Sequence, residues 1–137
     1  MADVEKKEEK KQKKTRPVKL CSTTHRVRVS CGHLYITVSL HNEDNKPFEI
    51  FIAGSKLRGC RANQESVARL VSILLRNDLM DEAIDQLNGI ICHACVMEKT
   101  KLPPEEKKNI ANSCGDAVAK ILQEYYVEKP KSDGDKK

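Results

Sequence analysis

The chain has 137 residues, enough for one domain of ordinary size, and its 39% hydrophobic content allows a modest core but excludes a large catalytic barrel. Its formal net charge is +5, and this charge is unevenly distributed. Segment 1–16 holds seven Lys or Arg and four acidic residues, segment 129–137 holds four Lys and two Asp, and the part between them is neutral.

The two charged ends lack the apolar residues that a packed core requires. We therefore predict disordered basic tails at 1–16 and 129–137, flanking one domain at 17–128. A basic tail can attract nucleic acid through counterion release, although a mixed run of Lys and Glu is more often a solubilising extension. Nucleic acid binding through the tails is therefore one hypothesis.

The N-terminus lacks the apolar stretch of a signal peptide, and no run approaches the ~20 apolar residues of a membrane span. We expect a cytoplasmic protein with no membrane partner. In that reducing compartment, six cysteines favour metal binding or thiol chemistry over a disulfide framework.

The first half of the domain predicts three strands. From Thr24, Val27 and Val29 alternate with two arginines, and a turn at Cys31-Gly32 leads into the alternating segment 33–40. A polar turn at 42–46 precedes a third alternating segment at 47–52. A three-stranded antiparallel meander is the simplest arrangement of these strands.

Segment 60–76 has the clearest helical periodicity. Asn63 is the predicted N-cap, and Gln64 falls on the polar side. The apolar stripe, which is predicted to face the core, consists of Val67, Leu70, Val71, Leu74 and Leu75.

Two further helices are predicted. Asp78 is a candidate cap for a short helix that ends at Asn88-Gly89, and Ser113 is a candidate cap for the last helix, whose first turn contains Cys114 and Asp116. The polar segment 96–108 suggests an insertion with one helical turn after its two prolines. The expected fold is α+β, with the meander packed against about three helices.

Cys31, Cys60, Cys92 and Cys114 each stand where one predicted element passes to the next. Thiolates that converge at one end of a small domain can hold a tetrahedral, structural zinc ion. Cys92 and Cys95 also form a CxxC pair, a spacing that serves zinc sites and redox dithiols equally. The alternative to both roles is that the cysteines are buried separately and serve only to pack the core.

Four separated motifs resemble the TSCPD domain, a C-terminal module of adenosylcobalamin-dependent ribonucleotide reductases that also occurs as a free-standing protein. They are SCGHLYITV at 30–38, GC at 59–60 ahead of VARLVS at 67–72, QLNGI at 86–90 ahead of Cys92, and SCGDA at 113–117. The resemblance covers about residues 22–126. It implies a zinc-binding module whose ligands are Cys31, Cys60, Cys92 and Cys114.

The chain departs from that pattern in three ways. Gly115 replaces the proline of the signature, Cys95 is an additional cysteine, and the tail at 129–137 lacks the C-terminal cysteine pair that the reductases use for re-reduction. Cys95 and His93 are candidate alternative zinc ligands. Cys95 is also a candidate redox thiol.

We therefore expect a free-standing zinc module that acts by binding nucleic acid, a nucleotide or a partner protein rather than by catalysis, because the chain is too short for reductase catalysis. A thiol-donating accessory to a ribonucleotide reductase and a small nucleic-acid-binding regulator are the alternatives. Lys56, Arg58 and Arg61, which flank Cys60, are candidate phosphate contacts.

Overall fold

The predicted meander is confirmed in a computed structural model, which describes residues 14–30, 32–54 and 60–127. The strands are β1 (Cys21–Val29), β2 (Gly32–Leu40) and β3 (Pro47–Ala53), in the order β1-β2-β3, and both pairs are antiparallel. β1 begins three residues before the predicted start. Cys31, Lys56 and Arg58 lie outside the described residues, so the predictions made for them remain predictions.

Five helices complete the described part of the chain, which is therefore α+β, as expected. They are α1 (Cys60–Arg76), α2 (Met80–Leu87), α3 (His93–Thr100), α4 (Pro104–Lys107) and α5 (Cys114–Val127). The single turn after the prolines is present as α4. α3 was not predicted, because Cys95 is its one buried residue and so its sequence shows no apolar stripe.

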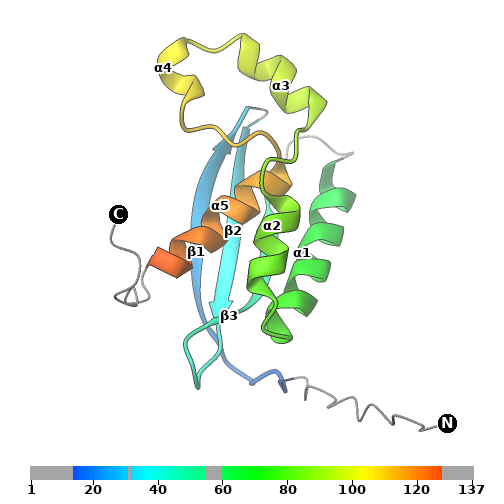
Figure 1. Ribbon diagram of the computed structural model, residues 1–137, viewed down its shortest axis with the longest axis vertical. Coiled ribbons are helices and arrows are strands. Elements are labelled where there is room, and N and C mark those ends of the chain that lie inside the picture. The colour runs from blue at the N-terminus through cyan, green and yellow to red at the C-terminus, as the bar shows by residue number, and fades with distance from the viewer. Residues whose placement is uncertain (1–13, 31, 55–59, 128–137) are drawn as a thin grey trace, which may run out of the picture.

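One face of the sheet forms the core. Figure 1 shows α5 crossing the sheet on the same side as α2, while α1 runs beside β3. Leu34, Ile36 and Val38 of β2 face this core together with Val118 and Leu122 of α5. Val118 and Leu122, one helical turn apart, thus form part of the buried face of α5.

The buried face of α1 differs from the prediction. Leu70 is 64% exposed, whereas Gln64 and Ser72 are buried. The reason is that α1 lies against the open edge of β3, where the Ser72 hydroxyl accepts from the Ile50 N–H (3.1 Å) and donates to the Ile50 carbonyl (3.2 Å). Backbone groups at a strand edge need polar partners, so the helix turns polar residues inward.

Two predicted helix caps are wrong. α1 begins at Cys60, so Asn63 lies inside its first turns and does not precede them. Asp78 has a positive φ of 57°, and Leu79 holds the N-cap position of α2 without a side-chain cap. In contrast, Gly89 has a φ of +78°, the left-handed conformation predicted for the end of α2.

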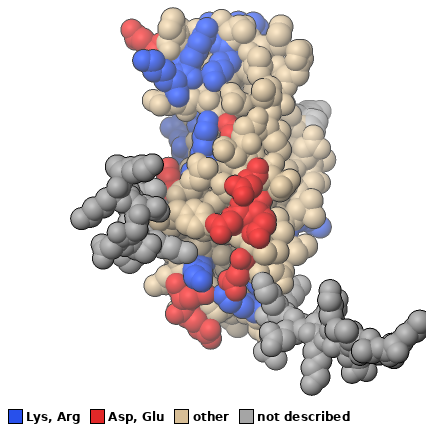
Figure 2. Space-filling model, in the orientation of Figure 1, with Lys and Arg blue, Asp and Glu red and all other residues tan. Residues whose placement is uncertain are grey.

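The helical face of the molecule carries charge in two zones. Figure 2 shows acidic side chains gathered over α2, and Lys and Arg gathered over the end formed by α3 and α4. In the described residues, no helix combines the length and the apolar character that crossing a membrane requires.

Candidate functional site at the cysteine corner

Three of the four predicted zinc ligands stand at helix N-termini. Cys60 is the first residue of α1, Cys92 is the N-cap residue of α3, and Cys114 is the first residue of α5. All three helices start near one end of the sheet (Figure 1). We call this region, formed by these three cysteines and the backbone around them, the cysteine corner.

Hydrogen bonds connect the segments of the cysteine corner. The buried side-chain amide of Gln64 donates to the Cys114 Sγ (3.4 Å), which joins the first turns of α1 and α5. The Cys92 N–H donates to the Asn112 carbonyl (3.0 Å), which holds the start of α3 beside the start of α5. A thiol at the start of a helix lies near the positive end of the helix dipole, which stabilises negative charge.

The buried carboxylate of Asp116 organises this corner. Its Oδ1 accepts from the Gly89 N–H (2.9 Å), and its Oδ2 accepts from the Asn112 N–H (2.9 Å) and from the Lys120 ammonium (3.0 Å). The Asp116 N–H donates in turn to the Ser113 hydroxyl (3.0 Å), which confirms the predicted cap of α5. The carboxylate therefore joins the end of α2 to the start of α5.

The ionised form of Asp116 is favoured despite its burial. Burial alone would raise the pKa of this carboxyl, but the hydrogen bonds from Asn112, Gly89 and Lys120 outweigh burial and hold the pKa below its ordinary value. In the SCGD motif, the aspartate thus builds the turn that presents Cys114.

Cys60, Cys92 and Cys114 share this corner but do not form a closed metal site among the described residues. Across residues 14–30, 32–54 and 60–127, no group of three or more His, Cys, Asp or Glu side chains is positioned to hold a metal ion. The predicted fourth ligand, Cys31, is outside these ranges. Thiolate sulfur is nevertheless a donor type that suits zinc.

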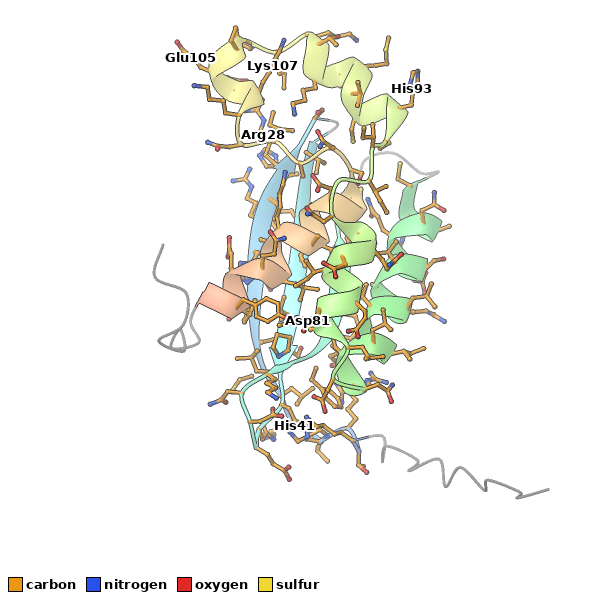
Figure 3. All side chains as sticks on the ribbon, in the orientation of Figure 1. Arg28, His41, Asp81, His93, Glu105 and Lys107 are labelled. Atoms are coloured by element: carbon orange, nitrogen blue, oxygen red, sulfur yellow. The ribbon has the colours of Figure 1, made fainter. Side chains whose placement is uncertain are left out.

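The remaining candidates occupy different surroundings. Cys95 is 1% exposed and packs in the core, while Cys92, three residues earlier, is half-buried. His93 is exposed at the start of α3 (Figure 3). Arg61 is exposed near the start of α1 and lines the groove between α1 and β3.

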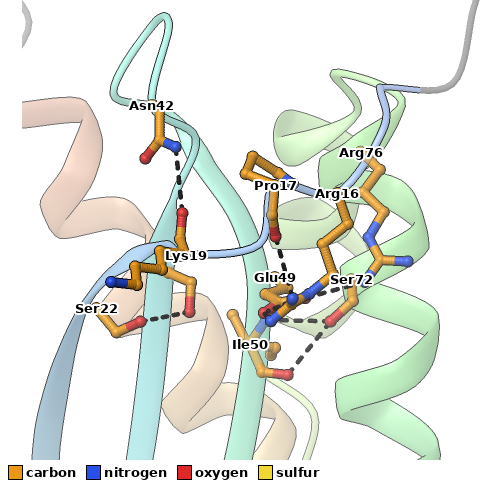
Figure 4. A network of polar contacts seen from close by, with 10 residues as sticks. Arg16, Pro17, Lys19, Ser22, Asn42, Glu49, Ile50, Ser72 and Arg76 are labelled. Carbon is orange, nitrogen blue, oxygen red and sulfur yellow. Dashed lines mark hydrogen bonds and ion pairs between the residues drawn. The ribbon is translucent and has the colours of Figure 1, made fainter.

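Sequence reasoning missed a second buried carboxylate. Glu49 on β3 is 2% exposed and pairs with Arg16 (2.9 Å) and Arg76 (3.0 Å), as Figure 4 shows. The Arg16 hydrogen bonds hold the pKa of Glu49 below its ordinary value; burial opposes this effect, and the Arg16 charge and Arg76 add to it. Glu49 alternates with the apolar residues Phe48 and Ile50 of β3, and nothing local in the sequence marks its partners.

Comparison with known proteins gives one match. A family model described as the TSCPD domain matches residues 6–126, in agreement with the resemblance carried by the four motifs. No curated protein and no solved structure matches the chain.

Proposed function

The chain belongs to the TSCPD domain family, and from that premise we propose that it is a zinc-binding module that acts by binding another molecule rather than by catalysis. The proposed ligands are Cys60, Cys92, Cys114 and Cys31. We place the protein in a reducing compartment such as the cytoplasm, where these thiols stay available to a metal.

The observation that carries the proposal is the cysteine corner itself. Three cysteines that are 32 and 22 positions apart in sequence stand at three helix N-termini, and a buried carboxylate fixes the turn around one of them. β1 ends at Val29 and β2 begins at Gly32 at this same end of the sheet (Figure 1), and Cys31 stands between these two residues in the sequence.

Zinc, when bound, would cross-link the segments that carry its ligands. The helices at this corner are joined by long connections, and the free energy of metal binding would add to the free energy of folding. Since the three thiols of the cysteine corner are not arranged as a closed site among the described residues, zinc binding would draw them together. A structural zinc site of four thiolates leaves no position open for water, which favours binding over hydrolytic chemistry.

Native mass spectrometry of the purified chain tests the metal. We expect one zinc per chain, lost when any of the four cysteines is replaced by serine. Cys21→Ser is the matched control, because Cys21 is exposed on β1, away from the corner, and should leave the zinc in place. A folded protein that binds no zinc after purification and zinc titration would refute the proposal.

A second function has one observation in its favour. Cys92 is half-buried at the N-cap of α3 and Cys95 is buried one turn later, which is the arrangement of an attacking thiol and a resolving thiol in a CxxC pair. The protein would then donate electrons to a separately encoded ribonucleotide reductase. The two cysteines would cycle between dithiol and disulfide.

A redox titration separates the two functions. Only the thiol donor is expected to form a reversible Cys92–Cys95 disulfide. Mass spectrometry of the alkylated protein detects this disulfide. Cys95→Ser would abolish that disulfide and leave a zinc site of Cys31, Cys60, Cys92 and Cys114 intact.

A further inference from the structure

The sheet face opposite the core differs from an ordinary polar surface. On this outer face the alternation places Arg26 and Arg28 of β1, His33 and Tyr35 of β2, and Phe51 of β3. Tyr35 is 41% exposed and Phe51 is 56% exposed, and α5, the helix that crosses the sheet, lies on the other face (Figure 1). Two aromatic rings and two arginines therefore face solvent on three adjacent strands.

The strand register brings the two rings together. Tyr35 pairs with Ala53, and Phe51 pairs with Thr37, so the two aromatic residues are diagonal neighbours on β2 and β3. Diagonal neighbours on one sheet face are within reach of aromatic side chains. Arg26 lies directly across from Tyr35 on β1, so a cation flanks the aromatic pair.

The charge of the three strands is one-sided. Glu49 is their one carboxylate, and it is buried and held by two arginines. It lies toward the end of the outer face that the segment before β1 covers (Figure 4). Arg28 at the end of the face pairs with Glu106 of α4 (2.9 Å), whereas Arg26 has no ion pair among the described residues and is the strand cation left for a ligand.

The surface continues beyond the sheet. A groove of about 640 Å³ between β3 and α1 is lined by Phe51, Ile73, Arg61 and Arg69. Arg69 pairs with Glu65, whereas Arg61 adds a further exposed cation beside the aromatic pair. A strand that stacks on the rings can therefore lay its backbone along arginines on either side.

We propose that this outer face is a binding platform for a single-stranded nucleic acid, with bases stacked on Tyr35 and Phe51 and phosphates held by Arg26 and Arg61. Aromatic rings on an exposed sheet stack unpaired bases, and flanking arginines neutralise the backbone. An apolar protein partner would gain less from a face whose rings are flanked by cations. The proposal deepens the binding function above and rests on it for the premise that the module binds, but it does not require the zinc.

Fluorescence anisotropy with a 5′-labelled mixed-sequence 12-mer tests the platform with the full chain. We expect single-stranded RNA or DNA to bind more tightly than the same sequence as a duplex. Tyr35→Ala and Phe51→Ala should each weaken binding by roughly tenfold. Tyr35→Phe and Phe51→Tyr preserve the rings and should keep affinity within about twofold, which separates stacking from damage to the fold.

Two further variants sharpen the assignment. Arg26→Gln should reduce the slope of log affinity against log salt by about 1, since one phosphate contact is lost. Ile91→Ala removes an apolar side chain that is 67% exposed in the connection before α3, and it should leave affinity unchanged.

Three results would overturn the platform: no binding of any single strand at low salt, preference for the duplex, or full affinity in the Tyr35→Ala, Phe51→Ala double variant. Full affinity in the double variant would indicate that the basic tails, and not the outer face, contact the nucleic acid. Zinc counted by native mass spectrometry on the same samples keeps the two proposals apart. A zinc-loaded protein that binds no nucleic acid refutes only the platform, and a zinc-free protein that binds it refutes only the metal site.

Discussion

In the part of the chain that the structure describes, two carboxylates are buried by different means, one at the cysteine corner and one near the opposite end of the sheet. Asp116 receives two backbone N–H groups, from the end of α2 and from just before the SCGD turn, and a lysine one turn further along α5. Among the described residues, the Glu49 carboxylate is instead held by two arginine side chains from distant segments.

This difference has consequences for rigidity. Backbone donors are fixed by the chain itself, so Asp116 sits in a preformed cradle whose loss leaves N–H groups unpaired in the interior. Arginine side chains must be ordered to reach their partner, and the Arg16 side chain is 50% exposed. The cysteine corner is therefore the more rigid of the two, as a site that presents ligands requires.

The largest expected effect comes from Asp116→Ala. This change removes the acceptor of two buried N–H groups and the partner of Lys120, so we expect the free energy of unfolding to fall by about 3–5 kcal/mol, measured by urea denaturation. Asp116→Asn keeps one carbonyl oxygen and should cost less. A loss below about 1 kcal/mol for the alanine variant would show that the cradle is not what fixes this corner.

A smaller effect is expected for Glu49→Gln, about 2 kcal/mol in the same measurement, because Arg76 is left partly buried beside a neutral side chain. Glu65→Gln is the matched control: it breaks an exposed pair with Arg69 and should cost no more than about 0.5 kcal/mol. If Glu49→Gln and Glu65→Gln had the same free energy of unfolding, the Glu49 ion pairs would stabilise the fold no more than an exposed surface pair does.

The same contrast explains how much could be predicted from the sequence. The strands, Gly89 and the Ser113 cap were predictable because each depends on neighbours a few residues away. The role of Asp116 in joining α2 to α5 was not, although its place in the first turn was. That role depends on Gly89, 27 residues earlier in the chain.

Long-range contacts account for the other failures. Gln64 and Ser72 are buried because α1 lies against the edge of β3 and beside Cys114, which no helical periodicity can indicate. Glu49 finds Arg16 and Arg76 at separations of 33 and 27 residues. For the candidate site, the sequence predicted cysteines at element boundaries, while the structure shows the hydrogen bonds that join Cys114 to Gln64 and Cys92 to Asn112.

The pH dependence tests whether both carboxylates stabilise the fold as anions. Because the pKa of each is lowered in the folded state, the stabilisation is complete above the unfolded pKa near 4 and is lost as the pH falls through the lower folded value. We expect the urea midpoint to be level from pH 7 to about 5 and to fall below about 4. The Asp116→Asn, Glu49→Gln double variant should show a shallower fall, and an unchanged slope would assign the acid sensitivity to other groups.

The smallest expected effect is that of Arg16→Gln, because this arginine is half exposed and Arg76 still faces Glu49. What it should change is the attachment of the segment before β1, which Lys14 also holds through Asp44 (2.7 Å). Trypsin should therefore cleave after Lys19 faster in Arg16→Gln than in the parent protein, with the unfolding midpoint nearly unchanged. Arg69→Gln, which breaks an exposed pair on α1, should leave that cleavage rate as it is. Faster cleavage in Arg16→Gln alone would show that the arginines at Glu49 attach the segment before β1 to the sheet. The hydrogen bonds to Asp116, in contrast, contribute to the stability of the whole fold.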